Sequence, residues 1–406
     1  MSARFVPIAA ICVREIGRFN ASSWPTSSFD YIDISAVDAS SKMILAARTL
    51  ATDDAPSRAQ SIVREGDILV STVRPNLNAV ALVPRELDGA VCSSAFAVLR
   101  CHESELAKYL YCFVQSPVFI AALSSVASGS HYPAVSDANV FDVRLPLGSG
   151  DPAVTANRIS AALAEVRGAA SLVTQQVQAA DLLPRSALSI FFANRPPVVA
   201  GPISAAELSP SWCSQSLLRF ARLESGHTPS RRRPDWWVGP VPWLALPDIR
   251  KLHGKLALET IETINDAGLA NSSARLLPVG TVCLCRDASI GFVTMLGRPM
   301  ATSQHFCNWI CDPESLDPEF LMYAFMASFD YLRALGSGSV LKTIYMPTIQ
   351  SFHISAPSID EQRRIARTLR EQLAAAEALQ KRLAERQVEI ERLPQRILAA
   401  AFGDAD

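Results

Sequence analysis

Two kinds of hydrophobic pattern alternate along this chain. In residues 1–150 and again in residues 211–357, short apolar runs follow glycine turns, as in Gly66-Asp67-Ile68-Leu69-Val70 and Gly280-Thr281-Val282-Cys283-Leu284. Runs of this length that are bounded by turn residues predict strands. Each block also contains an amphipathic stretch, over about 104–123 and about 317–335, that predicts a helix. We therefore expect two globular domains of mixed helix and strand.

After each block the apolar spacing becomes that of a coiled coil. In residues 151–193 the spacing alternates between four and three, through Ile159, Leu163, Val166, Ala170, Val173, Val177 and Ala180. In residues 358–406 one row recurs every seven residues, through Leu369, Ala376, Leu383, Ile390 and Ile397, and a second row holds Ile365, Leu379 and Leu393, interrupted by Gln372 and Arg386. Helices of about 35–40 residues are about 55–60 Å long and are better formed as a pair than alone.

Each predicted long helix contains a proline near its end. Pro184 and Pro394 follow a leucine at matching positions of the two helices. Because proline lacks a backbone N–H and normally kinks or breaks a helix, we expect each long helix to end one turn early and a short second helix to follow.

The second half of the chain repeats the first at an offset of about 210 residues. The clearest match pairs the segment 183–192 with the segment 393–402, and both end in phenylalanine. A repeat of this length indicates a duplicated domain with a duplicated long helix, joined through a proline-rich linker over 194–210. The predicted fold class is α+β, with two globular domains in a pseudo-twofold arrangement, separated by two long antiparallel coiled-coil helices.

Composition narrows the class of protein. The 406 residues are 49% apolar, which allows substantial cores, and no apolar run of membrane-spanning length or signal-peptide pattern is present. We therefore expect a cytoplasmic protein without a membrane partner. Nine cysteines, an odd number, do not suggest a disulfide framework. The net charge of −1 requires that any contact with DNA use segregated positive charge or charge supplied by other subunits.

Several motifs, in a fixed order, resemble one family. Pro357-Ser358-Ile359-Asp360-Glu361-Gln362-Arg363-Arg364-Ile365-Ala366 opens the second long helix, and Ser225-Gly226-His227-Thr228-Pro229-Ser230-Arg231, Val241-Pro242-Trp243-Leu244 and Leu277-Pro278-Val279-Gly280-Thr281 precede it. Gly66-Asp67-Ile68-Leu69-Val70-Ser71-Thr72-Val73-Arg74-Pro75-Asn76 stands in the first half. Nearly the whole chain is similar to the DNA-specificity subunit of Type I restriction-modification systems.

The resemblance implies a division of labour between domains and helices. Residues 1–150 and 211–357 would be target-recognition domains, each reading one half of an asymmetric bipartite site in double-stranded DNA. The helices, 151–193 and 358–406, would act as a spacer and dock two methyltransferase subunits, with restriction and translocase subunits joining the assembly. S-adenosylmethionine, ATP and magnesium would belong to the partner subunits, whereas this chain would bind no cofactor and perform no chemistry.

Candidate DNA-binding residues lie in the loops of both halves. A DNA reader needs side chains that fork to guanine or pair with adenine, and cations or donors along the phosphates. The candidates are Arg58, Arg74, Asn76, Asn78, Ser130, His131, Thr228, Ser230, Arg231, Arg232, Arg286 and Lys342. For several of them a solvated basic loop, a turn-forming asparagine or a structural arginine ion pair is an equally good interpretation.

Other classes of protein are open to test. Cys283, Cys285, His305, Cys307 and Cys311 suggest a zinc hypothesis, but the cysteines alternate along apolar strands, so we expect buried reduced thiols and no metal. Phosphate-loop, hydrolase-elbow and metalloprotease motifs are absent from the sequence. The remaining alternatives are a specificity subunit of another methylation-based phage-defence system, a thiol- or zinc-dependent enzyme, and a structural coiled-coil adaptor.

Overall fold

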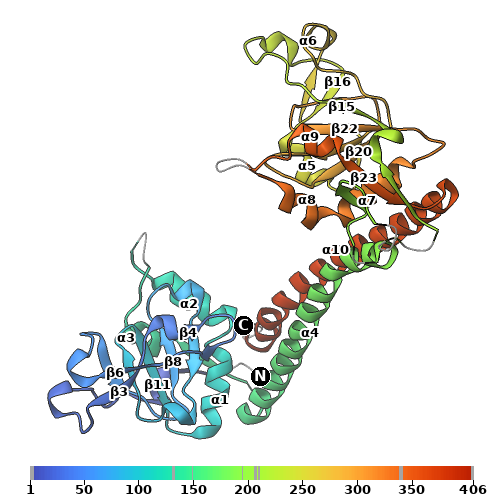
Figure 1. The fold of residues 1–406 in the computed structure, drawn as a ribbon. Coiled ribbons are helices and arrows are strands. Elements are labelled where there is room, and N and C mark those ends of the chain that lie inside the picture. Colours follow the sequence, from blue (N-terminus) through green and yellow to red (C-terminus); the bar gives the residue numbers. More distant parts are fainter. Residues whose placement is uncertain are drawn as a thin grey trace. The chain divides into compact units, whose positions relative to one another are not determined.

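A computed structural model describes residues 4–129, 133–148, 150–193, 195–204, 208, 211–337 and 342–403. The chain divides into two compact units (Figure 1). Unit 1 comprises Met1–Gln175 together with Ala384–Asp406, and unit 2 comprises Gln176–Leu383. Unit 1 is therefore built from two segments that are far apart in the sequence.

The described part of unit 1 combines short strands with three helices and parts of two long ones. Its strands are β1 (Arg4–Pro7), β2 (Cys12–Val13), β3 (Ser28–Ile32), β4 (Val37–Asp38), β5 (Met43–Ile44), β6 (Arg48–Ala51), β7 (Ala59–Ile62), β8 (Ile68–Ser71), β9 (Val80–Leu82), β10 (Val91–Ser93), β11 (Phe96–Cys101) and β12 (Arg144–Leu147). Its helices are α1 (Ser104–Phe113), α2 (Pro117–Val126), α3 (Asp137–Asp142), the first part of α4 (Pro152–Phe192) and the last part of α10 (Ile359–Phe402).

Unit 2 has a similar set of elements. Its strands are β13 (Val198–Ala200), β14 (Cys213–Ser216), β15 (Ala221–Ser225), β16 (Val241–Leu244), β17 (Leu256–Ala257), β18 (Glu262–Ile264), β19 (Val282–Cys285), β20 (Val293–Leu296), β21 (Ala301–Thr302), β22 (Phe306–Cys311) and β23 (Phe352–Ala356). Its helices, besides the remaining parts of α4 and α10, are α5 (Leu246–Leu252), α6 (Asp266–Ala270), α7 (Pro318–Ala327), α8 (Phe329–Leu335) and α9 (Met346–Gln350).

The two units share a topology. The strand order β2-β11-β8-β9 in unit 1 matches β15-β22-β19-β20 in unit 2, and the parallel pair β3 and β10 matches the parallel pair β16 and β21. Gly66 and Gly280 precede the matching strands β8 and β19 with φ of 84° and 81°, a conformation that glycine adopts without a steric penalty. The α+β class and the duplication predicted from the repeat are confirmed in the order of the elements.

Each predicted amphipathic helix is two helices in the structure. The first is divided at Ser116, whose hydroxyl accepts a hydrogen bond from the backbone N–H of Phe119 at 3.2 Å while Pro117 occupies the first helical position. Ser116 is thus an N-cap, and it starts α2 at 72° to α1. The second is divided at Ser328, between α7 and α8. The apolar periodicity predicted helix correctly at both places but did not reveal the breaks.

The strict heptad row of α10 is buried, as predicted. Leu369, Ala376, Leu383 and Ile390 are at most 8% exposed, and Ile397, the last member of the row, is partly buried. The second row was assigned wrongly at its polar positions, because Gln372 and Arg386 are exposed, whereas Ile365 is buried and Leu379 and Leu393 are partly buried. When the spacing between seam residues alternates between four and three residues from Leu369 onward, the second row contains Leu373, Gln380 and Gln387. All three are partly buried.

The two long helices run antiparallel. In unit 1, Ile159 near the start of α4 shares a core with Leu398 near the end of α10. In unit 2, Phe192 at the end of α4 shares a core with Ile365 and Leu369 near the start of α10. The antiparallel pairing predicted for these helices is therefore confirmed by the packing inside each unit.

Both long helices continue through their prolines, so the prediction of an early helix end is wrong. Pro184 has no N–H for the carbonyl of Ala180, four residues earlier, which leaves that carbonyl without its helical donor. The amide Nε2 of Gln380 lies 3.3 Å from this oxygen and 3.1 Å from Oδ1 of Asp181, and donates to both. A side chain of the opposite helix thus replaces the hydrogen bond that proline removes.

Part of the predicted linker, 194–210, forms strand β13 and pairs with β23. The backbone N–H of Ser355 in β23 donates to the carbonyl of Pro197 at 2.8 Å, on the β13 side. In unit 1, β12 pairs with β1 as β23 pairs with β14, which places Pro146 at the position of Ser355. Pro146 has no N–H, and its carbonyl accepts the hydroxyl of Tyr109 at 2.8 Å. In unit 2 the edge of this strand pair is therefore covered by a third strand, β13. In unit 1 a proline at the matching position cannot donate the corresponding hydrogen bond.

Among the described helices, none by itself has the length and apolar composition of a membrane span. The bent pair α1 and α2 meets these two criteria only when its halves are taken together.

Replacing Gln380 should destabilise unit 2 only while Pro184 is present. We expect Gln380→Leu to lower the free energy of unfolding by about 1–2 kcal/mol, because the Ala180 carbonyl loses its donor. In a Pro184→Ala background the restored backbone N–H supplies that donor, and the same substitution should have little effect. Urea unfolding of the four combinations measures the coupling. Gln387→Leu is the control, since that amide donates only to the Glu391 side chain. Equal losses in both backgrounds would show that the amide does not cap the carbonyl.

Candidate nucleic-acid interface

In each unit, three segments that are distant in the sequence meet at one place. In unit 1 they are the turn after β8, the turn before β11 and the segment around Ala134. Thr72 N–H donates to the carbonyl of Ala95 at 2.8 Å, and Val135 N–H donates to the carbonyl of Thr72 at 2.9 Å. We call this meeting point the loop cluster of unit 1.

The loop cluster of unit 2 is built in the same way. Arg286 N–H, after β19, donates to the carbonyl of His305 at 2.9 Å, and Ile344 N–H donates to the carbonyl of Arg286 at 2.8 Å. The bridge between Asp287 and Thr343 corresponds to the bridge between Val73 and Ala134 in unit 1. Backbone hydrogen bonds therefore fix equivalent turns, and the side chains on them are free to differ.

The unit 1 cluster gathers three of the sequence-predicted residues. Arg74 and Asn76 are exposed on the turn after β8, where the backbone N–H of Arg74 donates to the carbonyl of Pro133 at 2.7 Å. Arg58 is exposed, and its carbonyl accepts the N–H of Ser94 at 2.8 Å, which anchors it beside the turn before β11. The candidates Ser130 and His131 lie outside the described residues.

Asn78 is a structural residue and was wrongly taken as a DNA-binding candidate. It is 6% exposed with φ of 48°, a left-handed conformation that asparagine tolerates well. Its side-chain amide donates to the carbonyl of Val114 at 2.8 Å, and its Oδ1 accepts from Nζ of Lys42 at 2.8 Å. Burial lowers the pKa of Lys42 to about 8. The side chain of Asn78 is occupied on both sides inside the unit.

The unit 2 cluster contains Thr228, Arg286 and Lys342. Thr228 donates its hydroxyl proton to Oε1 of Gln304, and Nε of Arg286 donates to the backbone carbonyl of Gln304 at 3.3 Å. Lys342 is exposed and lines a hollow of about 490 Å³ together with Arg333. Sequence reasoning did not select Gln304 or Arg333, because only the fold brings them beside the candidates.

The basic loop after Thr228 divides into residues with different roles. Arg231 makes a two-bond ion pair with Glu262, at 2.5 and 2.8 Å, and its guanidinium lies 3.6 Å from the ring centre of Trp237. The hydrogen bond between them raises the pKa of Arg231 and lowers that of Glu262. In the free chain Arg231 is thus held in the structural ion pair that the sequence left open as an alternative to DNA contact.

The neighbours of Arg231 complete this picture. The backbone carbonyl of Ser230 accepts a hydrogen bond from the indole N–H of Trp237 at 3.3 Å, which stabilises the turn. Arg233 pairs with Asp235 at 2.7 Å. Arg232 is exposed, and within the described part of the chain its side chain has no ion pair. Of the three consecutive arginines, Arg232 is the one with its charge available to a phosphate.

The cysteines of the zinc hypothesis are buried thiols. Cys283, Cys285 and Cys307 are inaccessible to solvent, and burial raises the pKa values of Cys285 and Cys307 to about 12. The thiol of Cys285 donates to the carbonyl of Asp287 at 3.0 Å. The His305 side chain interacts with a carboxylate instead of with the thiols, since its Nδ1 is 2.5 Å from Oδ1 of Asp287. Among the described residues, no group of three histidine, cysteine or acidic side chains is placed to hold a metal ion.

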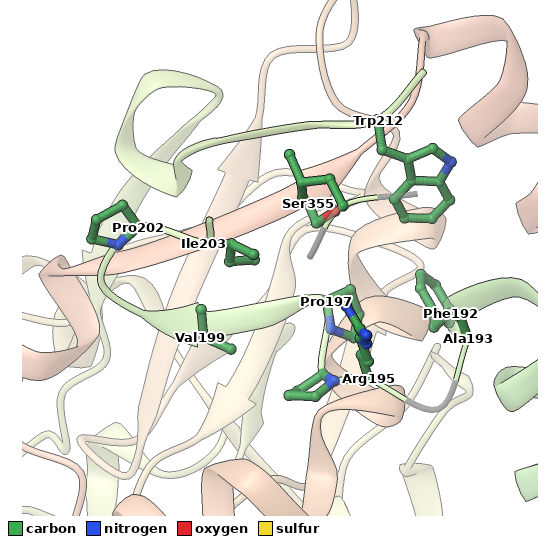
Figure 2. A pocket seen from close by; sticks show the side chains of 11 residues that line it. Phe192, Ala193, Arg195, Pro197, Val199, Pro202, Ile203, Trp212 and Ser355 are labelled. Atoms are coloured by element: carbon green, nitrogen blue, oxygen red, sulfur yellow. The ribbon is translucent and has the colours of Figure 1, made fainter. Parts of the chain in front are cut away.

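A hollow of about 620 Å³ lies beside the end of α4 in unit 2 (Figure 2). Figure 2 shows Phe192 and Trp212 at one end of this hollow and Pro202 and Ile203 at the other. The described lining is mostly apolar, and Arg195 is its charged member. It presents no paired acid and base or activated nucleophile, so it does not favour an enzyme active site.

Two units with one topology, equivalent loop clusters and different cluster side chains define a duplicated recognition protein. Comparison with known proteins points to one family. The sequence pattern of the Type I restriction modification DNA specificity domain matches residues 212–386. The MjaIX specificity subunit of Methanocaldococcus jannaschii is 28% identical over 160 residues, which cover 39% of this chain and 37% of that protein. The HindI specificity subunit of Haemophilus influenzae is 20% identical over 84% of this chain and 86% of that protein.

Solved structures agree with these sequence matches. The HsdS subunit of Thermoanaerobacter tengcongensis is 25% identical with a TM-score of 0.70, over 100% of this chain and 97% of that one. A structure from work on complex assembly and conformational transition of the type I R-M system has the same fold, with a TM-score of 0.74 at 24% identity. The sequence matches and the solved structures all indicate a specificity subunit of a Type I restriction-modification system.

The two adjacent arginines should separate in their effects. We expect Arg231→Ala to lower stability by about 1 kcal/mol, because an exposed ion pair and a cation–π contact are lost together. Arg232→Ala should leave stability within about 0.5 kcal/mol, and should reduce the slope of log affinity for DNA against log salt by about 1 if Arg232 contacts a phosphate. Thermal unfolding and salt-dependent binding by the complex with methyltransferase measure both. A salt slope that changes only with Arg231→Ala would reverse the assignment.

Proposed function

We propose that this chain is the non-catalytic, sequence-specific DNA-recognition subunit of a Type I restriction-modification complex. Each loop cluster reads one half of a bipartite site in double-stranded DNA. The observation that carries this proposal is that equivalent backbone hydrogen bonds build both clusters, whereas their exposed side chains differ: Arg74 and Ser94 in unit 1 stand where Ala288 and Gln304 stand in unit 2. A common scaffold with different reading residues suits two different half-sites.

The surface of α4 supports a role in docking partner subunits. Leu172, Leu182 and Ile190 are 61%, 63% and 72% exposed, which is unusual for leucine and isoleucine on a helix in water. We propose that two methyltransferase subunits pack on the helix pair and that restriction and translocase subunits join them. Those partner subunits, rather than this chain, bind S-adenosylmethionine, ATP and magnesium. The complex works in the cytoplasm, where it meets the chromosome.

The near-neutral charge of the chain fits this arrangement. The exposed cations of the clusters, Arg58 and Arg74 in unit 1 and Arg232 and Lys342 in unit 2, supply local positive charge, and the methyltransferase subunits supply the rest of the phosphate contacts. A specificity subunit that serves another methylation-based defence system would share the same recognition surface. Its partner subunits, rather than its DNA site, would distinguish the two.

Sequencing of methylated adenines tests the proposed function. The chain is expressed with its methyltransferase in a host without other adenine methylation. Because the two clusters carry different side chains, we expect one bipartite motif with unequal halves. Replacing Arg74 with alanine should relax one half, and replacing Lys342 with alanine should affect only the other. A palindromic motif, or no sequence-dependent methylation, would contradict the proposal.

Lengthening both helices should lengthen the spacer between the half-sites. Four residues inserted after Gln175 in α4 and after Leu383 in α10, close to one turn in each, nearly preserve the buried seam and add about 6 Å. At 3.4 Å per base pair we expect a spacer longer by one or two base pairs with both half-sequences unchanged. Insertion of two residues in each helix is the control, because it rotates the seam and should abolish methylation. An unchanged spacer with active enzyme would show that the helices do not set the distance.

A further inference from the structure

Gln304 stands at the centre of the unit 2 loop cluster. It is exposed on the turn before β22, directly beside Arg286, whose Nε donates to the Gln304 carbonyl. Gly226 makes this arrangement possible, because a Cβ at that position would lie 2.0 Å from the carbonyl oxygen of Ser303. The close approach at Gly226 places Thr228 against the Gln304 side chain.

The side-chain amide of Gln304 is held in one orientation by its neighbours. The hydroxyl of Thr228 donates to its Oε1, and its Nε2 lies 3.5 Å from Nε2 of His305. The other ring nitrogen of His305, Nδ1, lies 2.5 Å from the Asp287 carboxylate and carries the proton. In the neutral ring Nε2 of His305 is then an acceptor and takes a hydrogen from the nitrogen of the Gln304 amide. Each hydrogen bond in this series, from Thr228 through Gln304 and His305 to Asp287, then has one donor and one acceptor.

This network leaves the Gln304 amide with one free donor and one free acceptor. An amide oxygen has two lone pairs and an amide nitrogen has two hydrogens, and the network uses one of each. The free pair is the complement of adenine in the major groove, where N6 donates and N7 accepts. Guanine presents two acceptors on the same edge and needs two donors. The exposed edge of Gln304 therefore matches adenine and does not match guanine.

Unit 1 carries no such group at the matching place. The turn before β11 aligns Ser94 and Ala95 with Gln304 and His305. The amide reader is thus a property of one unit, as reading of two different half-sites requires.

We propose that Gln304 reads an adenine in the half-site of unit 2 through N6 and N7. Thr228 and the His305–Asp287 pair are positioning residues that fix which way its amide faces. This inference rests on the proposed function, since it needs unit 2 to enter the major groove of the recognised DNA.

The test replaces single atoms of the DNA. Duplexes that carry the recognised site are made with each adenine of the unit 2 half-site replaced in turn by 7-deazaadenine, which lacks the N7 acceptor. We expect the affinity of the wild-type complex with methyltransferase to fall about threefold to tenfold when one particular adenine is replaced. The loss is smaller than that of the whole contact, because only one of its two hydrogen bonds is removed. In the Gln304→Ala complex the same replacement should have no effect at that adenine. Gln350→Ala, at an exposed glutamine of α9, is the matched control and should keep the wild-type sensitivity.

The outcomes separate this inference from the proposed function. If the wild-type complex binds no duplex sequence-specifically, the proposed function is wrong and the inference falls with it. If the wild-type complex binds its site and Gln304→Ala keeps the same sensitivity at every adenine, the inference alone is wrong.

The positioning residues are tested by selectivity rather than by affinity alone. Thr228→Val removes the donor that fixes the amide, so methylation should extend to sites with another base in place of the adenine. Thr228→Ser keeps the hydroxyl and should restore the original motif. His305→Ala should relax the same position, because the amide nitrogen loses its acceptor. Thermal unfolding of the three variants verifies that each folds. An unchanged motif in both Thr228→Val and His305→Ala would overturn the positioning role.

Discussion

The aromatic residue that ends each long helix must be buried in a globular core, and the rest of the structure depends on this constraint. Phe192 packs with Phe320 and Trp212 at ring-centre distances of 5.6 and 6.1 Å, and Phe402 packs with Tyr109 and Phe113 at 5.3 and 5.4 Å. With these ends held, a break inside either helix would move a core residue. The substitute hydrogen bond from Gln380 preserves the path of α4 through Pro184 at the cost of a polar side chain in the seam.

The loop clusters show how a duplicated scaffold supports divergence. Hydrogen bonds between backbone atoms position the turns in both units, so exposed side chains at matching positions of those turns can differ. Arg231 illustrates the opposite case, since its pairing with Glu262 and stacking on Trp237 commit a promising cation to the fold. The number of arginines in a loop therefore does not by itself tell how many of them are available to a phosphate.

The sequence predicted the features that depend on local periodicity. The seven-residue row through Leu369 and the duplication were visible because regular burial imposes them. The second row was misassigned, since Gln380 and Gln387 are polar and their burial depends on the partner helix. Strand β13 was hidden in a proline-rich stretch because its pairing with β23 spans about 150 residues. Gln304 escaped notice for the same reason: its neighbours Thr228 and Arg286 come from other segments.

The discontinuity of unit 1 has a consequence for the order in which the protein forms. The ribosome synthesises most of unit 1 before unit 2, but Leu398 and Phe402 belong to the core of unit 1 and leave the ribosome after unit 2. Unit 2 is complete in the sequence before that moment, and domains generally fold as units during synthesis. Until then Tyr109 and Phe113 lack the aromatic side chain that covers them, and the closing segment must return across more than 200 residues of chain. Of the two units, the one whose synthesis begins earlier is thus the one that is completed later.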